Sequence, residues 1–143
     1  MDPMLRSGLV FAGEGDDARL TAEEVALLDL RGTELVVLSA CETALGDRTL
    51  GEGVHGLQRG FAVAGAQSVV MTLWAVPDAV TSQLMAGFYR RLLRRRDPLT
   101  PVAALREAQL ELLGERRQRL GESRPQDWAA FLASGVSGTG LRD

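Results

Sequence analysis

Two short apolar runs separated by a helical pattern set the strongest limit on how this chain can fold. The runs at 35–40 (LVVLSA) and 68–74 (SVVMTLW) are rich in aliphatic and β-branched residues, which is typical of short buried strands. Between them, apolar residues recur at helical spacing until Gly65 ends the pattern. Strand, helix and strand form a βαβ unit, so we expect two parallel strands whose carboxyl ends share one edge of a sheet.

Shorter elements are predicted before this unit. Residues 9–12 read as a short extended piece, and residues 14–17 as a polar turn. Thr21 then begins a T-A-E-E sequence in which Glu24 can bond back to the N-cap. This capping box predicts a short helix that runs to about Leu28.

Two further helices are predicted after the second strand. One begins at Ala79 and ends in a cluster of arginines between residues 90 and 96, which we interpret as a solvated helix end matched to the helix dipole. Thr100 and Pro101 suit the N-cap and first positions of the next helix, which should stop near Gly121. Residues 127–134 are expected to close the fold as a last strand or a packed turn, and residues 136–143 as a disordered tail.

Composition favours one α/β domain over residues 1–143. The chain is 45% hydrophobic, which is sufficient for a core. Its net charge of −3 argues against nucleic acid or an anionic membrane as a partner. With neither a signal peptide nor a long apolar run, we expect a cytoplasmic protein. The chain has no Lys, Ile or Asn, which indicates a GC-rich, bacterial source.

The single cysteine and single histidine restrict the chemistry. Cys41 and His55 have no second residue of their kind, which excludes an internal disulfide and a cysteine-based or histidine-based metal cluster. We therefore expect no metal and no cofactor. Cys41 follows the first strand, at the edge where open α/β sheets bind ligands. It is either a small buried residue or a nucleophile activated by a neighbouring base.

Three other polar residues are weighed beside Cys41. Asp78 follows the second strand and suits the N-cap of the helix from Ala79, or the acidic floor of a pocket for a basic side chain. Glu42 could cap or orient the loop after Cys41, or contact substrate. His55 lies in the helical pattern and is expected at the surface.

A glycine pattern at 51–56 (GEGVHG) has the spacing of a dinucleotide-binding turn. About ten residues separate it from the preceding strand, whereas that motif needs a tight strand-to-helix turn. Glu52 would also place a carboxylate against the phosphates. Nucleotide binding is therefore the remote alternative.

The motifs LVVLSACETALGD, GEGVHGLQRGFAVAGAQSVVMTLWAVPD, LMAGFYRRLL and WAAFLASG occur in an order that resembles CHAT domains, relatives of caspases and separases. The likeness spans Met4 to Gly135. It implies a caspase-like three-layer α/β sandwich with a mainly parallel sheet, in which Cys41 matches the nucleophile. Asp78 matches an acidic position that recognises a basic residue before the scissile bond.

The resemblance also implies a histidine-glycine pair upstream of the cysteine, which this sequence does not contain. In caspases the histidine stands about 50 residues before the cysteine, whereas 40 residues precede Cys41. The strands around that histidine should be missing too, which leaves residues 35–40 as an open strand edge. Two hypotheses follow. Either a companion segment, companion chain or second copy completes a cysteine peptidase that acts on a protein or peptide, or the chain is an inactive interaction module.

Overall fold

The parallel strand pair predicted from the two apolar runs lies in the middle of the fold. The computed structural model describes residues 7–13, 18–39, 52–121 and 124–135. Strand β3 (Val36–Leu38) pairs in parallel with β4 (Ser68–Thr72), with Leu38 opposite Met71. Helix α3 (Glu52–Ala64) connects them, and Gly65 follows it with φ +105°. The expected βαβ unit is therefore present, although both strands are shorter than their apolar runs.

The third strand of this sheet runs the other way. β5 (Phe131–Gly135) pairs antiparallel with β4, which gives the order β3-β4-β5. The one-turn helix α6 (Pro125–Trp128) brings the chain to the carboxyl end of β4, so the next strand can only run back along it. The expected mainly parallel sheet is not confirmed, because the described sheet is mixed. The sequence predicted a last strand or a packed turn here, and the structure contains both, as the short helix α6 and the strand β5.

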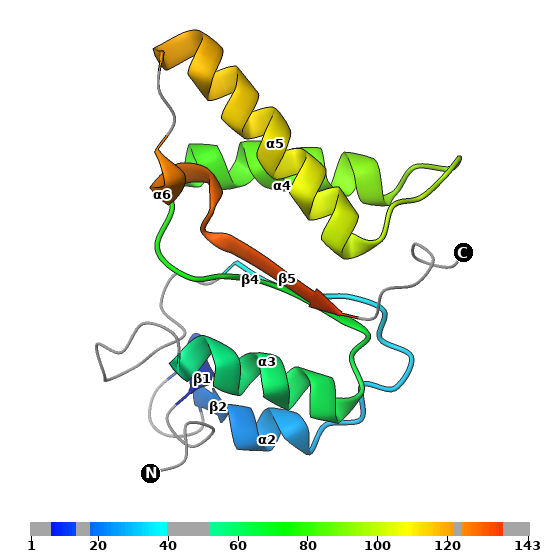
Figure 1. The fold of residues 1–143 in the computed structure, drawn as a ribbon. Coiled ribbons are helices and arrows are strands. Elements are labelled where there is room, and N and C mark those ends of the chain that lie inside the picture. Colours follow the sequence, from blue (N-terminus) through cyan, green and yellow to red (C-terminus); the bar gives the residue numbers. More distant parts are fainter. Residues whose placement is uncertain (1–6, 14–17, 40–51, 122–123, 136–143) are drawn as a thin grey trace.

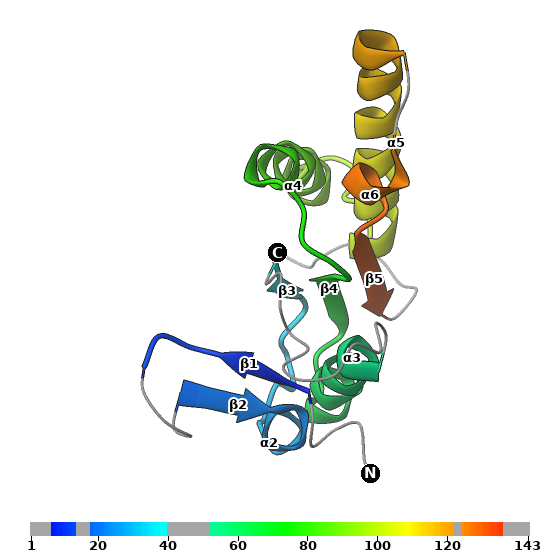
Figure 2. The same ribbon diagram turned by 90° about the vertical axis from the view of Figure 1, so that its left-hand side faces the viewer.

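Helices cover both faces of the sheet (Figure 1). Every residue of β4 is buried, and its side chains alternate between two cores. Val69 and Met71 belong to a core shared with α2 (Ala22–Ala26) and α3. Val70 belongs to the opposite core, shared with α4 (Asp78–Leu92) and α5 (Pro101–Leu120). Figure 2 shows the same three layers edge-on, with β4 between them.

The predicted helix boundaries are mostly confirmed. Thr21 and Glu24 form the complete capping box of α2, and the Thr21 main-chain N–H donates to the Glu24 carboxylate at 2.7 Å. Thr100 accepts the capping hydrogen bond of α5, and Gly121 ends that helix with φ +73°. These ends depend on local side-chain-to-backbone bonds, which is why the sequence alone located them.

The arginine-rich end of α4 differs from its sequence interpretation as a solvated surface. The side chain of Arg91 is only 12% exposed and donates to Glu111 at 2.9 Å and to Glu107 at 3.1 Å, both on α5. The hydrogen bond with Glu111 is the main reason why the pKa of Arg91 is raised and that of Glu111 lowered. Part of the arginine cluster therefore joins two helices.

An antiparallel hairpin lies outside the three-stranded sheet. β1 (Gly8–Val10) pairs with β2 (Arg19–Thr21), with Leu9 opposite Leu20. The sequence predicted the first of these strands and missed the second. The expected turn at 14–17 and tail at 136–143 lie outside the described residues.

The two edges of the sheet are not equivalent. β3 is an edge strand, and its three residues are only half-buried. Along β5, the Gln109 side chain donates to the Phe131 carbonyl at 3.0 Å. A side chain of α5 thus supplies a hydrogen bond to the free edge of β5. Within the described ranges, β3 pairs with β4 alone.

Candidate active site

The carboxyl ends of β3 and β4, where the sequence predicted the site, share one edge of the sheet. Because Leu38 lies opposite Met71, the chain leaves both strands at the same edge of the sheet. Ser39, the last described residue of the first exit, is exposed. Cys41 and Glu42 follow it and lie outside the described residues. The structure therefore defines the strand that leads to Cys41.

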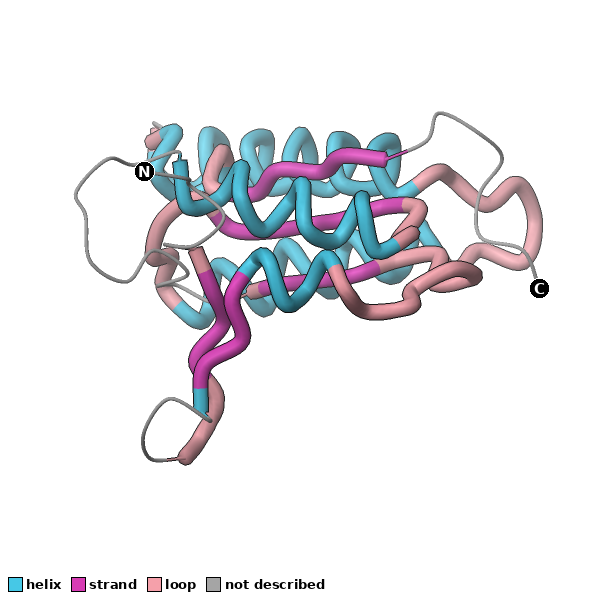
Figure 3. The backbone as a smooth tube through the Cα atoms, turned by 90° about the horizontal axis from the view of Figure 1, so that it is seen from below, coloured by secondary structure: helices cyan, strands magenta, loops and turns pink. Residues whose placement is uncertain are grey.

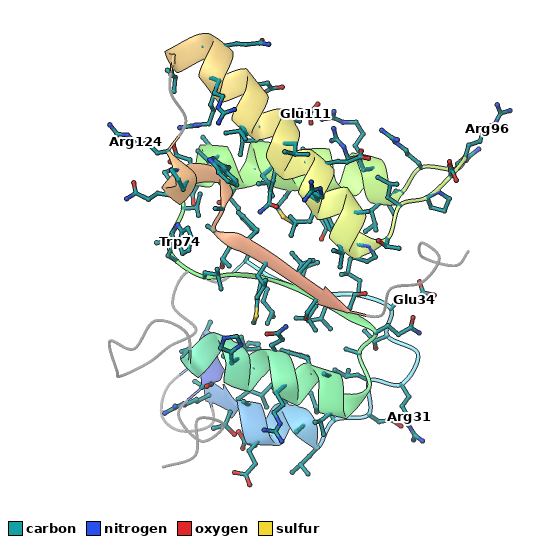
Figure 4. The ribbon with its side chains drawn as sticks, in the orientation of Figure 1. Arg31, Glu34, Trp74, Arg96, Glu111 and Arg124 are labelled. Atoms are coloured by element: carbon teal, nitrogen blue, oxygen red, sulfur yellow. The ribbon has the colours of Figure 1, made fainter. Side chains whose placement is uncertain are left out.

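The exit from β4 is fixed by contacts with the segment around α6. Thr72 is buried at the end of the strand. The main-chain N–H of Leu73 donates to the Ala130 carbonyl at 2.7 Å, and the indole N–H of Trp74 donates to the Gln126 carbonyl at 2.9 Å. Figure 4 shows Trp74 where the chain leaves β4, close to α6. These bonds hold the loop that leads to Asp78.

The sequence predicted Asp78 as the N-cap of α4, but the helix begins one residue earlier than expected. Asp78 is exposed and is the first residue of α4, whereas Pro77 occupies the N-cap with φ −55° and ψ 137°. The Pro77 carbonyl accepts from the N–H groups of Val80 and Thr81, so the helix starts without a side-chain cap. The N-cap prediction was thus wrong by one residue. A carboxylate in the first turn still interacts favourably with the helix dipole, and its exposure leaves it accessible to a basic group.

His55 lies near the start of α3 and is exposed, as the sequence predicted. Glycines 53 and 56 fall inside the same helix, which begins at Glu52. Because a helical backbone uses its N–H groups internally, this stretch is not the loop that cradles a pyrophosphate. The structure therefore gives no support to the nucleotide-binding alternative.

A group of contacts that sequence patterns missed holds α6 against α5. The side-chain amide of Gln109 donates to the carbonyls of Trp128 and Phe131, each at 3.0 Å. Arg116 pairs with Asp127 at 2.8 Å. These residues stand far apart in the sequence and have no periodicity in common, so no local pattern marked them. Together the contacts position the segment on which the β4 exit loop rests.

The described part of the chain holds no group of three or more acidic, histidine or cysteine side chains placed to bind a metal ion. None of its helices combines the length and apolar character needed to cross a membrane.

Comparison with known proteins identifies relatives. The curated protein "Tetratricopeptide repeat protein 28" of Mus musculus is 38% identical over 117 residues, and the Homo sapiens protein of the same name is 35% identical over 116 residues. Each match covers 81% of this chain and 4% of the relative, so the chain spans a small part of these proteins. Both relatives are mammalian, and they do not confirm the bacterial source that composition suggested.

The family comparison agrees with the order of the motifs. The profile of the CHAT domain matches residues 1–136, which include both exits from the parallel strands and all the described elements. On this match, the chain belongs to the CHAT domain family.

Proposed function

We propose that this CHAT domain supplies the nucleophile half of a caspase-like cysteine peptidase site, with Cys41 as the nucleophile. A histidine would come from a companion segment that pairs beside β3. The observation that carries this proposal is the parallel register of β3 and β4, in which Leu38 lies opposite Met71. That register brings the exit toward Cys41 and the exit toward Asp78 to one edge, where open α/β sheets bind ligands.

Each group would have a separate role in peptide hydrolysis. The companion histidine takes the thiol proton, and the Cys41 sulfur attacks the scissile carbonyl carbon. The peptide C–N bond then breaks as the histidine returns the proton to the leaving amine, and water hydrolyses the remaining thioester. Asp78, exposed at the start of α4, would pair with a basic side chain before the scissile bond. Glu42 would orient the loop between them.

The domain by itself should be a weak peptidase. An unperturbed thiol has a pKa of about 8.5, so only a few per cent is thiolate at neutral pH. His55, the one histidine in this sequence, is not assigned as the base, because its position does not correspond to the family's histidine-glycine pair. The glycine of that pair would also supply part of the oxyanion hole, a contribution of about 3 kcal/mol in other enzymes.

Labelling of Cys41 tests the proposal. The companion is the segment encoded immediately upstream of Met1, long enough to reach the position about 50 residues before the cysteine, and it is expressed as a separate polypeptide. Mixing should raise the rate at which a peptide electrophile ending in arginine labels the domain. The Cys41→Ala variant should lose the label. Labelling that does not respond to the companion, or that persists in Cys41→Ala, would contradict a peptidase role.

A second candidate function is an inactive interaction module. It is favoured by the edge of β3, which pairs with β4 alone among the described residues. It is also favoured by a match to a small part of proteins whose name refers to tetratricopeptide repeats, an architecture that forms extended binding surfaces. Light scattering after size exclusion would detect association through this edge. A companion that binds a Cys41→Ser variant and the unmodified domain equally, without any labelling of the latter, would favour this function over a peptidase.

A further inference from the structure

Three consecutive arginines lie in the loop between α4 and α5. Arg94, Arg95 and Arg96 are exposed, and none of them forms an ion pair with another described residue. Arg91, by contrast, lies within α4 and pairs with two glutamates of α5. The helix dipole interacts with charge only within the last turn, so it does not account for three further cations beyond the end of the helix. These cations are accessible to an external partner.

The loop that carries these arginines is anchored at both of its ends. Leu92 is buried at the end of α4, and the main-chain N–H of Leu93 donates to the Tyr89 carbonyl at 2.9 Å. After the arginines, Asp97 turns the chain with φ 60°, and Leu99 packs against the core shared with α4 and α5. Because fixed ends reduce the entropy that a loop loses on binding, the three guanidinium groups are presented from a short segment that is already positioned.

Two exposed apolar side chains lie next to these arginines. Tyr89 is 39% exposed and Leu93 is 68% exposed, and side chains four residues apart are neighbours on a helix surface. The Tyr89 ring contacts the ring of buried Phe88 edge to face, with 5.1 Å between the ring centroids. This contact holds the Tyr89 ring against the domain. We use the term arginine patch for this surface, which consists of Tyr89, Arg90, Leu93, Arg94, Arg95 and Arg96.

The arginine patch and the candidate active site lie at opposite ends of the molecule. α4 begins at Asp78, and its 15 residues span about 22 Å before the patch. In Figure 4, Arg96 and Trp74 lie on opposite sides, and Arg96 points away from the body of the domain. Figure 3 shows from below that the loops at the Arg96 end, drawn in pink, lie beyond the three strands. A partner bound there would not compete with a ligand at the edge where Cys41 follows.

The charge on the rest of the chain decides which anionic partner fits the patch. Residues 89–97 contain five arginines and one aspartate, a charge of +4, so the other residues must carry −7 to give the total of −3. A membrane surface or a long nucleic acid extends past the patch and would be repelled by this negative charge. A short acidic polypeptide contacts the patch alone. Its apolar side chains can also contact Tyr89 and Leu93, which phosphate groups do not use.

We propose that the arginine patch binds an acidic, amphipathic polypeptide segment of a partner protein. Carboxylates of the segment pair with Arg94, Arg95 and Arg96, whose planar guanidinium groups match the geometry of a carboxylate. Apolar side chains of the segment contact Tyr89 and Leu93, which supply the anchor. The interaction involves neither Cys41 nor a companion histidine, so it does not depend on the proposed function.

Fluorescence anisotropy of a synthetic peptide tests the proposal. The probe is a labelled peptide in which glutamates surround one tryptophan and one leucine, and the matched neutral peptide has glutamine in place of each glutamate. The unmodified domain should bind the neutral peptide about tenfold more weakly than the acidic one, because several exposed ion pairs are lost. Affinity for the acidic peptide should fall with added salt, which screens exposed charges.

Two triple variants of equal net charge separate the patch from the overall charge of the domain. The patch variant replaces the three consecutive arginines by glutamine, and the control variant replaces three exposed arginines on α3 and at the far end of α5. The control residues also form no ion pair within the described part of the chain, and they are Arg59, Arg117 and Arg119. The patch variant should bind the acidic peptide about tenfold more weakly, and the control variant should bind it like the unmodified domain.

A second pair of variants tests the apolar part of the patch. Leu93→Ser should weaken binding of the acidic peptide several-fold, because the anchor is lost. Leu110→Ser is the control, because Leu110 is 52% exposed on α5 and lies outside the patch; it should bind like the unmodified domain. All the substituted side chains are exposed, so each variant should unfold within a few degrees of the unmodified domain.

Three results would overturn the proposal. Equal weakening in the two triple variants would assign binding to overall charge. Equal affinity of the unmodified domain for the acidic and the neutral peptide would remove the ionic contribution. Tighter binding of single-stranded RNA or phosphatidylserine vesicles, lost in the patch variant and unchanged in Leu93→Ser, would assign the patch to a phosphate-bearing partner instead.

Discussion

The indole N–H of Trp74 donates to the main-chain carbonyl of Gln126 at 2.9 Å, across 52 residues of sequence. Trp74 also packs against the core shared with α4 and α5, as does Trp128, which directly follows the Asp127 that pairs with Arg116. This hydrogen bond joins the exit of β4 to α6. Residues that are distant in the sequence therefore hold the loop before Asp78 in place.

The two tryptophans allow a matched test of this bond. Trp74→Phe should lower the free energy of unfolding by about 1 kcal/mol beyond any packing loss, because the Gln126 carbonyl loses its donor. Trp128→Phe is the control, because its buried indole N–H has no hydrogen-bond partner among the described residues; it should lose packing only. Urea denaturation of both variants measures the difference. Equal destabilisation would show that the Trp74 bond adds nothing.

Replacing glycine by alanine at two helical positions should change the stability of the fold in opposite directions. A Cβ at Gly60 would lie 2.6 Å from the Ala22 carbonyl oxygen, where α3 crosses α2. Gly60→Ala should therefore destabilise the fold by roughly 1–2 kcal/mol despite its better helix propensity. A Cβ at Gly114 of α5 meets nothing within 4 Å, so Gly114→Ala should stabilise by up to about 1 kcal/mol. Thermal and urea unfolding measure both, and a stabilised Gly60→Ala variant would contradict the close helix crossing.

The Arg91–Glu111 pair predicts a pH dependence. The hydrogen bond from Arg91 lowers the pKa of Glu111 from its usual value of 4.5. A carboxylate whose pKa is lower in the folded state stabilises that state fully above the unfolded pKa, and this contribution is lost as the pH falls through the folded pKa. Because the Glu111 side chain is 36% exposed, its size should be at most about 1 kcal/mol.

A double-mutant cycle measures this contribution. Arg91→Met, Glu111→Gln and the double variant are unfolded with urea at pH 7 and at several values below 4.5. The coupling free energy should be positive at pH 7 and should decline through the acid range, because protonated Glu111 no longer carries charge. A coupling that is constant with pH would assign the contact to packing and would contradict an ionic contribution.

Asp78 predicts separate effects on stability and on selectivity. Since it is the first residue of α4 and makes no capping bond, Asp78→Asn should lose only the dipole interaction, about 0.3–1 kcal/mol. In the presence of the companion segment, the same variant should label about tenfold more slowly with an arginine peptide and at an unchanged rate with a leucine peptide. Glu34→Gln is the control, because Glu34 lies at the other end of the sheet (Figure 4). Equal slowing with both peptides would remove Asp78 from substrate recognition.

Local patterns determined much of this fold. The capping box at Thr21, the N-cap at Thr100 and the C-terminal Gly121 depend on bonds between residues three or four apart, and such bonds are visible in sequence. The two apolar runs separated by one helix likewise required a parallel pair, because a βαβ unit has no other compact arrangement. The family motifs around Cys41 pointed to the CHAT domain, and the family match agreed.

Tertiary structure decided what depends on residues that are distant in the chain. The antiparallel direction of β5 follows from where α6 brings the chain, which no periodicity encodes. Arg91 belongs to an interhelical ion pair because α5 lies across α4. The sequence by itself therefore determined the parallel pair and the edge at which Cys41 follows. Only packing decided that Gln109 bonds to part of the β5 edge while β3, among the described residues, pairs with β4 alone.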